Sequence, residues 1–429
     1  MLSNFIIKWY SRFIIFSSID KVSPFRWDAF SRRVALSPRK YMKLWFLWVI
    51  YFAAYFVAIL IRLVSRIWSH SRETSNTNFI TKLVFDTAYA TLLAANVCIM
   101  MFTLLKRDDV VTFVNQMLTL DERLKREFSA QLVLHRDLFT TTKYFLLELA
   151  VLATCLLTQF AAPPIFGIIV LDKNAPLHRF IAFLVNGGAP LKISLRMLPV
   201  IVFSTFAGFK AAGNVGFYIS TGAMYLQCVT TWVKVITPES AVAMVALSEK
   251  NDSSGKWRIV SNTLPVKKHI VRLRRTPLGL LEEGEILQAY KAQQLLNASC
   301  NIVYSSPWIV QQAGTFLIFA IFTSFFCIRL HKFVNPIITG IIFVAMLGDI
   351  CIVWIETYFM ADVSLAGDRF LKIMRESHIR QSETKRSIIA LWNVHFKIAH
   401  PLFLMKKRTF LTFMRALVDF MLTMILNSK

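Results

Sequence analysis

Acidic residues are scarce in this chain, and their scarcity is the first constraint on its function. Of the 429 residues, 25 are Asp or Glu and 49 are Lys or Arg, which gives a formal net charge of +24. A nucleic-acid-binding protein displays such charge on a soluble surface. Here the basic clusters lie between long apolar runs, and 55% of the residues are hydrophobic. We therefore expect membrane lipid as a partner and no nucleic acid.

The sequence also lacks the spacings typical of a catalytic or metal site. His135, His395 and His400 show no ligand spacing with Cys or acidic residues, and no Gly-rich phosphate loop occurs. We therefore expect no enzyme, metal or cofactor. The six cysteines lie in or beside apolar runs, which indicates small buried hydrophobic side chains and no disulfide framework. Lys8 and Arg12 interrupt the first apolar residues before they reach the ~7–15 of a signal-peptide core.

Seven segments are apolar enough to cross a membrane, which requires ~20 mostly apolar residues. The third has a proline break at Pro163 and Pro164, and the fourth, the least apolar, contains Lys210 and several glycines suited to close helix contact. We predict an all-α integral membrane protein with seven transmembrane helices. The predicted spans are residues 44–61, 83–105, 144–170, 198–229, 308–328, 334–360 and 409–426.

The basic residues also predict the orientation, because segments rich in Lys and Arg stay in the cytosol. With the amino terminus inside, the inner segments hold 36 basic residues and the outer segments hold 11. This inverted topology, with a cytoplasmic amino terminus and an extracellular carboxyl terminus, places two glycosylation sequons, at Asn251 and Asn297, on the inside. We expect both sequons to remain unused.

The long inner segments carry helical patterns of their own. Residues 280–304 contain few helix breakers and lead toward the fifth span, and residues 361–398 alternate apolar and charged side chains at helical spacing. We expect both to extend as helices into a cytosolic anchor region. The predicted organisation is a cytoplasmic segment (1–43), helices 1–4 (44–229), a cytoplasmic loop and helical extension (230–306), helices 5–6 (307–360), a cytoplasmic helical segment (361–408) and helix 7 (409–429).

Several local sequences resemble the insect gustatory and odorant receptor superfamily. Asn301 and Tyr304 before the fifth span match its Asn-x-x-Tyr approach, Leu198-Pro199 resembles the start of its fourth span, and His400-Pro401-Leu402-Phe403 occupies the place of its Cys-Gly-Leu-Phe turn. The hallmark Thr-Tyr, five hydrophobic residues and Gln-Phe is replaced by Asp419-Phe420, five residues and Leu426-Asn427. The chain is therefore identified as a divergent member of the gustatory type, with a bitter or other non-sugar tastant expected.

This resemblance implies a ligand-gated, non-selective cation channel in the plasma membrane of a sensory neuron. The channel would be a homo- or hetero-tetramer whose last span lines the pore. That role falls here on Asp419, Leu422, Thr423 and Leu426, with Leu422 or Leu426 as a hydrophobic gate. Asp419 and Leu426 are seven residues apart and share a helical face. The alternative for Asp419 is an intrahelical ion pair with Arg415, four residues earlier.

The resemblance also implies a pocket for a small-molecule tastant in the outer half of each subunit. Aromatic walls with a few polar anchors suit small amphipathic molecules. Lys210 is predicted ~18 Å along the fourth span, near the bilayer midplane, where Asp349 could pair with it. A structural ion pair is the alternative to ligand contact for this lysine. The candidate residues are Asp86, Tyr89, Phe203, Phe206, Lys210, Phe319 and Phe322.

Two other membrane functions compete with the channel. A seven-helix receptor that signals without a pore of its own is suggested by Asp121-Glu122-Arg123, but this triplet follows the second span instead of closing the third. Asn335-Pro336, which begins the sixth span, lacks the expected tyrosine. A transporter would predict internal repeats, and none is apparent. The channel remains the leading hypothesis.

Overall fold

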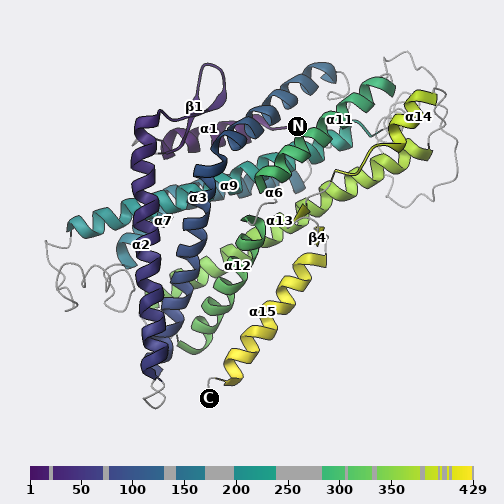
Figure 1. Cartoon of the computed structure of the whole chain (residues 1–429). Coiled ribbons are helices and arrows are strands. Elements are labelled where there is room, and N and C mark those ends of the chain that lie inside the picture. The colour runs from purple at the N-terminus through teal and green to yellow at the C-terminus, as the bar shows by residue number, and fades with distance from the viewer. Residues whose placement is uncertain are drawn as a thin grey trace, which may run out of the picture.

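The computed structural model describes most of the chain, and the described part is almost entirely helical (Figure 1). The described residues are 1–18, 23–70, 77–129, 142–169, 198–237, 283–304, 308–330, 336–376, 382–394, 397–398, 403–404 and 408–427. The helices are α1 (Asn4–Ser17), α2 (Arg39–His70), α3 (Thr77–Glu127), α6 (Thr142–Leu156), α7 (Ala162–Ile169), α9 (Leu198–Val235), α11 (Glu283–Tyr304), α12 (Trp308–Phe325), α13 (Pro336–Glu376), α14 (Ser382–Ile389) and α15 (Arg408–Asn427).

The described residues of every predicted span lie in helical structure. Six helical stretches in the described residues are long and apolar enough to cross a membrane, and a seventh, Gly314–Arg329, is apolar but shorter. Helices α2 and α13 run well beyond the predicted limits, because their charged ends favour a helix while lowering the hydropathy. The predicted end of the second span at residue 105 coincides with a kink at Lys106, after which α3 continues in a second helical segment. Helix α9 extends six residues beyond its predicted end. The expected continuation as helix is confirmed for residues 283–304 and 361–376.

The prolines of the third span do not end the helix, which corrects the predicted break. A π-helical turn, η1 (Leu157–Ala161), joins α6 directly to α7, which contains Pro163 and Pro164. Proline has no backbone N–H, so the carbonyl groups one turn earlier lose their usual partners. A π-turn is a common way for a helix to absorb such a local change in hydrogen bonding. A second π-turn, η3 (Phe326–Leu330), ends the fifth span.

Two short antiparallel hairpins were not expected from a search for apolar segments. One pairs β1 (Phe25–Asp28) with β2 (Arg33–Leu36), and the other pairs β3 (Lys397–Ile398) with β4 (Phe403–Leu404). The second flanks His400-Pro401, which lies outside the described residues. The amide of Asn115 fixes the first hairpin to α3, because it bonds both the N–H and the C=O of Val34, at 3.0 and 2.9 Å.

Helix α9 lies at the centre of the described structure. Three quarters of its residues from Ser204 to Val235 are buried, including polar ones such as Gln227. This enclosure explains its weak hydropathy, since a helix covered by protein need not be apolar toward lipid. Gly216 permits close approach, because a Cβ atom there would lie 2.8 Å from the Thr158 hydroxyl oxygen.

The inner part of the fold is held together by hydrogen bonds from α9. Tyr225 donates to the side-chain oxygen of Asn297 on α11 at 2.6 Å, and Lys234 binds Asp362 on α13 at 2.9 Å. Asn297 is only 3% exposed. Its buried amide is therefore not available for glycosylation in this structure, whereas Asn251 lies outside the described residues.

The cysteines only partly match the expectation of burial. Cys155, Cys228 and Cys300 are buried and Cys327 is half-buried. Cys98 and Cys351, however, are exposed on α3 and α13. Both belong to apolar stretches, so they occupy helix surfaces that need no burial within the subunit if lipid covers them. All six thiols are free.

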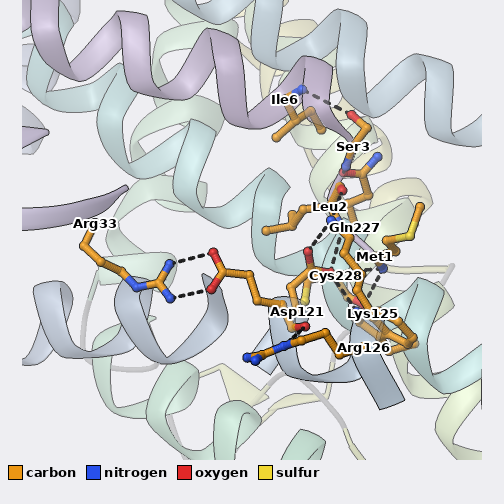
Figure 2. Close-up of polar contacts among 12 residues, drawn as sticks. Met1, Leu2, Ser3, Ile6, Arg33, Asp121, Lys125, Arg126, Gln227 and Cys228 are labelled. Carbon is orange, nitrogen blue, oxygen red and sulfur yellow. Dashed lines mark hydrogen bonds and ion pairs between the residues drawn. The ribbon is translucent and has the colours of Figure 1, made fainter. Parts of the chain in front are cut away.

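Asp121 connects the amino terminus to α3 and α9 (Figure 2). One carboxylate oxygen accepts hydrogen bonds from the Leu2 N–H at 2.9 Å and the Trp232 indole N–H at 2.8 Å. The other lies 2.7 Å from the Lys125 ammonium. The Met1 amine donates to the Cys228 carbonyl at 3.2 Å, and burial lowers the pKa of this amine to about 5. Asp121 therefore has a structural role in place of the receptor signature suggested by its sequence.

Replacement of Asp121 by alanine should strongly destabilise the protein. The change leaves the Trp232 and Leu2 N–H groups and the Lys125 ammonium without their shared partner, at an expected cost of about 3 kcal/mol or more. The neighbouring Glu122 is a matched control, because its pair with Arg33 at 2.8 Å is half exposed and contributes less than about 1 kcal/mol. Thermal unfolding of the purified full chain checks the difference. Equal midpoints for Asp121→Ala and Glu122→Ala would contradict it.

Candidate functional site

Helix α15 has one face packed on the rest of the subunit and one open face. Leu417 is buried against α12, and Met424 and Ile425 are partly buried on the same side. In Figure 1, α15 stands at the side of the helices; it packs mainly on α12 and α13, and its last turns also approach Val84 of α3. Almost the whole helix surface away from these two neighbours is exposed, including Leu411, Leu422 and Leu426.

The four predicted pore residues all belong to the open face of α15. Successive helical residues are ~100° apart, so Asp419, Leu422, Thr423 and Leu426 fall within an arc of ~100°. All four are exposed. Their exposure agrees with a shared role, which would require further subunits that surround the same space.

Arg415 shares this face with Asp419. The Arg415 guanidinium lies 3.7 Å from the Asp419 carboxylate, and the two side chains are 85% and 66% exposed. The intrahelical pair is thus present in the single chain. A charged side chain within a span normally contacts protein or water and not lipid tails, so this exposed pair requires such surroundings. The pair therefore does not exclude a pore role for Asp419.

The seven predicted pocket residues do not converge on a single pocket in the described structure. They separate into three groups, on α9, on α3 and on α12. The α9 group packs on the first span: the rings of Phe203 and Phe206 lie 5.4 and 5.6 Å from Trp48, and Phe203 lies 5.2 Å from Tyr51. The sequence interpretation missed Trp48 and Tyr51, although both lie within the first predicted span.

The α3 group is built around a buried ion pair. Asp86 is fully buried and binds the guanidinium groups of Arg66 and Arg62, the latter at 3.6 Å. Tyr89, one turn along α3, packs edge to face on Tyr55 at 5.8 Å. Asp86 is thus occupied by partners from α2. Arg62 and Arg66 had been assigned to an outer loop, but their spacing of four residues after an apolar run indicates a continuing helix with both on one side.

The α12 group packs on α3 beside Val84 and not on the aromatic residues of α2 and α9. Phe322 is half-buried beside Val84, Phe325 and Phe326, and Phe319 is half-buried one turn earlier. Both residues belong to α12, the helix against which α15 packs. No described contact joins them to Phe203 or Phe206.

Lys210 lies deeper in the subunit than the other candidates. It is 3% exposed, and its ammonium lies 5.4 Å from the ring centres of both Phe206 and Phe209. The Asp349 side chain proposed as its partner lies outside the described side chains. Lys210 and Trp45 line one small cavity, and Trp45 is only ~9 Å along α2 from its first residue. Lys210 is therefore level with the beginning of α2, and not with its middle.

This cavity, which we call the Lys210 cavity, has a volume of about 20 Å³. It lies where α1, the β1 strand, α2 and α9 meet. Its size suits about one water-sized group and excludes a whole odorant-sized molecule. Among the described residues, no cluster of three His, Cys, Asp or Glu side chains that could hold a metal is found.

Comparison with known proteins shows the fold. No family model and no curated protein sequence matches this chain. Two solved structures of the insect olfactory receptor OR5 from Machilis hrabei are similar over 97% of both chains. One has a TM-score of 0.57 at 8% identity, and the other, in complex with eugenol, has a TM-score of 0.53 at 10% identity. The chain therefore has the fold of an insect chemoreceptor.

The ion pair at Asp86 predicts that this residue stabilises the fold. Asp86→Asn should destabilise the protein by about 3–5 kcal/mol, because it leaves buried guanidinium charge without its partner. The double variant Asp86→Asn, Arg66→Met should recover part of this loss. Thermal unfolding of the purified full chain measures both. If the double variant is no more stable than Asp86→Asn, the pair is not the reason for the loss.

Proposed function

We propose that this protein is a chemoreceptor channel of the insect gustatory type, with seven transmembrane helices, a cytoplasmic amino terminus and an extracellular carboxyl terminus. Four copies, of this chain or of it with related receptors, would place the open faces of α15 around one pore in the plasma membrane. The observation that carries the proposal is the exposed Arg415–Asp419 pair. Charges in the middle of a span are costly in lipid. Water in a pore would remove that cost.

The chemistry of the open face supports conduction of cations. Four Asp419 carboxylates at one level would attract cations, with the adjacent Arg415 side chains limiting the strength of selection. One or two turns farther along, Leu422 and Leu426 would form apolar rings that exclude water when the pore is narrow. A weakly selective cation channel with a hydrophobic gate follows.

We propose that an external small organic molecule opens the pore. OR5, which shares this fold, has been solved in complex with eugenol. In this chain the α9 group is the best candidate for contact, because Phe203 and Phe206 with Trp48 and Tyr51 form a partly exposed aromatic surface. The gustatory assignment and the expected bitter or other non-sugar tastant rest on the sequence resemblance.

Replacement of Asp419 should change conduction without preventing assembly. Asp419→Asn removes four negative charges from the pore at nearly constant volume, so cation permeability relative to chloride should fall several-fold. Reversal potentials of ligand-evoked currents, recorded with this chain alone and with related receptors, measure the ratio. Asp108→Asn is the matched control, because Asp108 is an exposed acid on α3, far along the chain from α15.

Two results would count against the proposal. Unchanged conductance and selectivity in Asp419→Asn would restrict this residue to its pair with Arg415. Absence of current for every ligand and partner, with the protein confirmed at the cell surface, would contradict the channel itself.

A further inference from the structure

The Lys210 cavity collects polar side chains from three parts of the chain. Ser17 belongs to the last turn of α1, Trp45 to the second turn of α2, and Lys210 and Asn214 to successive turns of α9. The remaining described lining is mostly aromatic and aliphatic. None of the described lining residues is acidic.

Three of these polar side chains have a buried atom that lacks a hydrogen-bond partner. The atoms are the indole nitrogen of Trp45, the amide nitrogen of Asn214 and the hydroxyl oxygen of Ser17. Trp45 is 2% exposed and Asn214 is 6% exposed. The amide oxygen of Asn214 accepts from Thr103 at 3.4 Å, so the group left over is its N–H donor. Native structures contain few buried polar groups without partners, and three around one cavity indicate a missing ligand.

The unpartnered groups specify the chemistry of that ligand. Indole and amide N–H groups only donate, and so does the nearby Lys210 ammonium. A water molecule accepts two hydrogen bonds but must also place its own two hydrogens. An ionised phosphate oxygen accepts several hydrogen bonds and has no hydrogen of its own to donate. It is also stabilised by a nearby positive charge. The lining therefore favours an anionic oxygen over water.

The position of the cavity indicates where such an oxygen comes from. Beside Trp45, α2 exposes the apolar side chains of Leu44, Phe46 and Leu47, which are suited to contact with acyl chains. Before them, Arg39, Lys40 and Lys43 are exposed at the start of the helix. Basic pockets of this kind at the cytoplasmic side of transmembrane helices bind anionic headgroups. With about 20 Å³ available, the cavity takes one phosphate oxygen and leaves the rest of the lipid outside.

We propose that the Lys210 cavity binds the phosphate of an anionic phospholipid, whose acyl chains lie along the exposed face of α2. The bound phosphate joins α1, α2 and α9 through donors from each. This site adjoins the aromatic surface proposed for the tastant, since the Lys210 ammonium lies 5.4 Å from the Phe206 ring, but it contains no residue of the open face of α15. Its failure would therefore leave the proposed channel untouched.

The test uses the full-length protein in a neutral detergent, with thermal unfolding as the readout. Dioctanoyl phosphatidylglycerol, dioctanoylglycerol and inorganic phosphate are titrated separately. We expect phosphatidylglycerol to raise the unfolding midpoint and dioctanoylglycerol, which lacks the phosphate, to have no comparable effect. If inorganic phosphate alone gives the full increase and abolishes the response to phosphatidylglycerol, the phosphate site is upheld with the free anion as its occupant.

Two variants show whether the response comes from this cavity. Trp45→Phe replaces the indole by a smaller phenyl ring and so removes its N–H donor. Asn214→Leu replaces the amide by an apolar side chain of similar size. Each should raise the half-maximal phosphatidylglycerol concentration ~10-fold or more, since a hydrogen bond to a charged group is lost. Trp354→Phe is the matched control, because Trp354 is a half-exposed indole on α13 outside the cavity lining. If one variant does not fold, the other still gives the measurement.

Three results would overturn the proposal. The first is no stabilisation by phosphatidylglycerol in the wild-type protein. The second is an equal increase with dioctanoylglycerol, which would show that acyl chains alone are recognised. The third is an unchanged phosphatidylglycerol response in both Trp45→Phe and Asn214→Leu.

Discussion

The cost of charge in a hydrocarbon environment is the constraint on which the rest of this structure depends. A charged side chain in a span must reach a partner, an aromatic face or water. Asp86 meets two arginines of α2, which also joins α2 to α3, and Lys210 lies over two phenylalanine rings of its own helix, α9. The exposed pair of Arg415 and Asp419 differs, because within the described subunit its surroundings are open.

This difference connects the packing to the proposed function. The inner helices form a common core around α9, and the amino terminus is fastened to it through Asp121. Helix α15 takes little part in that core and rests on α12 and α13 along one face. A helix attached in this way can shift without disturbing the centre of the subunit. In the proposed assembly, further subunits and water would surround its exposed charged face.

Much of the fold could be predicted from the sequence, because apolar runs of span length are a strong signal. The limits of the helices were predicted less well, since the charged end of α2 continues the helix beyond the apolar run, whereas the predicted end of the second span coincides with the kink of α3 at Lys106. The candidate site was predicted less evenly. Spacing alone placed Asp419 and Leu426 on one helical face, and the structure shows that this face is exposed. Depth alone could not show that Asp86 is bound by Arg62 and Arg66, or that Phe203 and Phe319 lie apart, because such pairings depend on tertiary packing.

Accessibility of the open face of α15 to water is the most direct test of the central claim. Leu422→Cys should react with a charged, membrane-impermeant thiol reagent in the assembled receptor, and the reaction should alter the ligand-evoked current. Leu47→Cys, on the exposed apolar face of α2, should remain unreactive because lipid covers it. An unreactive Leu422→Cys in a receptor that reaches the cell surface and conducts would contradict the account, since α15 would then not line a water-filled pore.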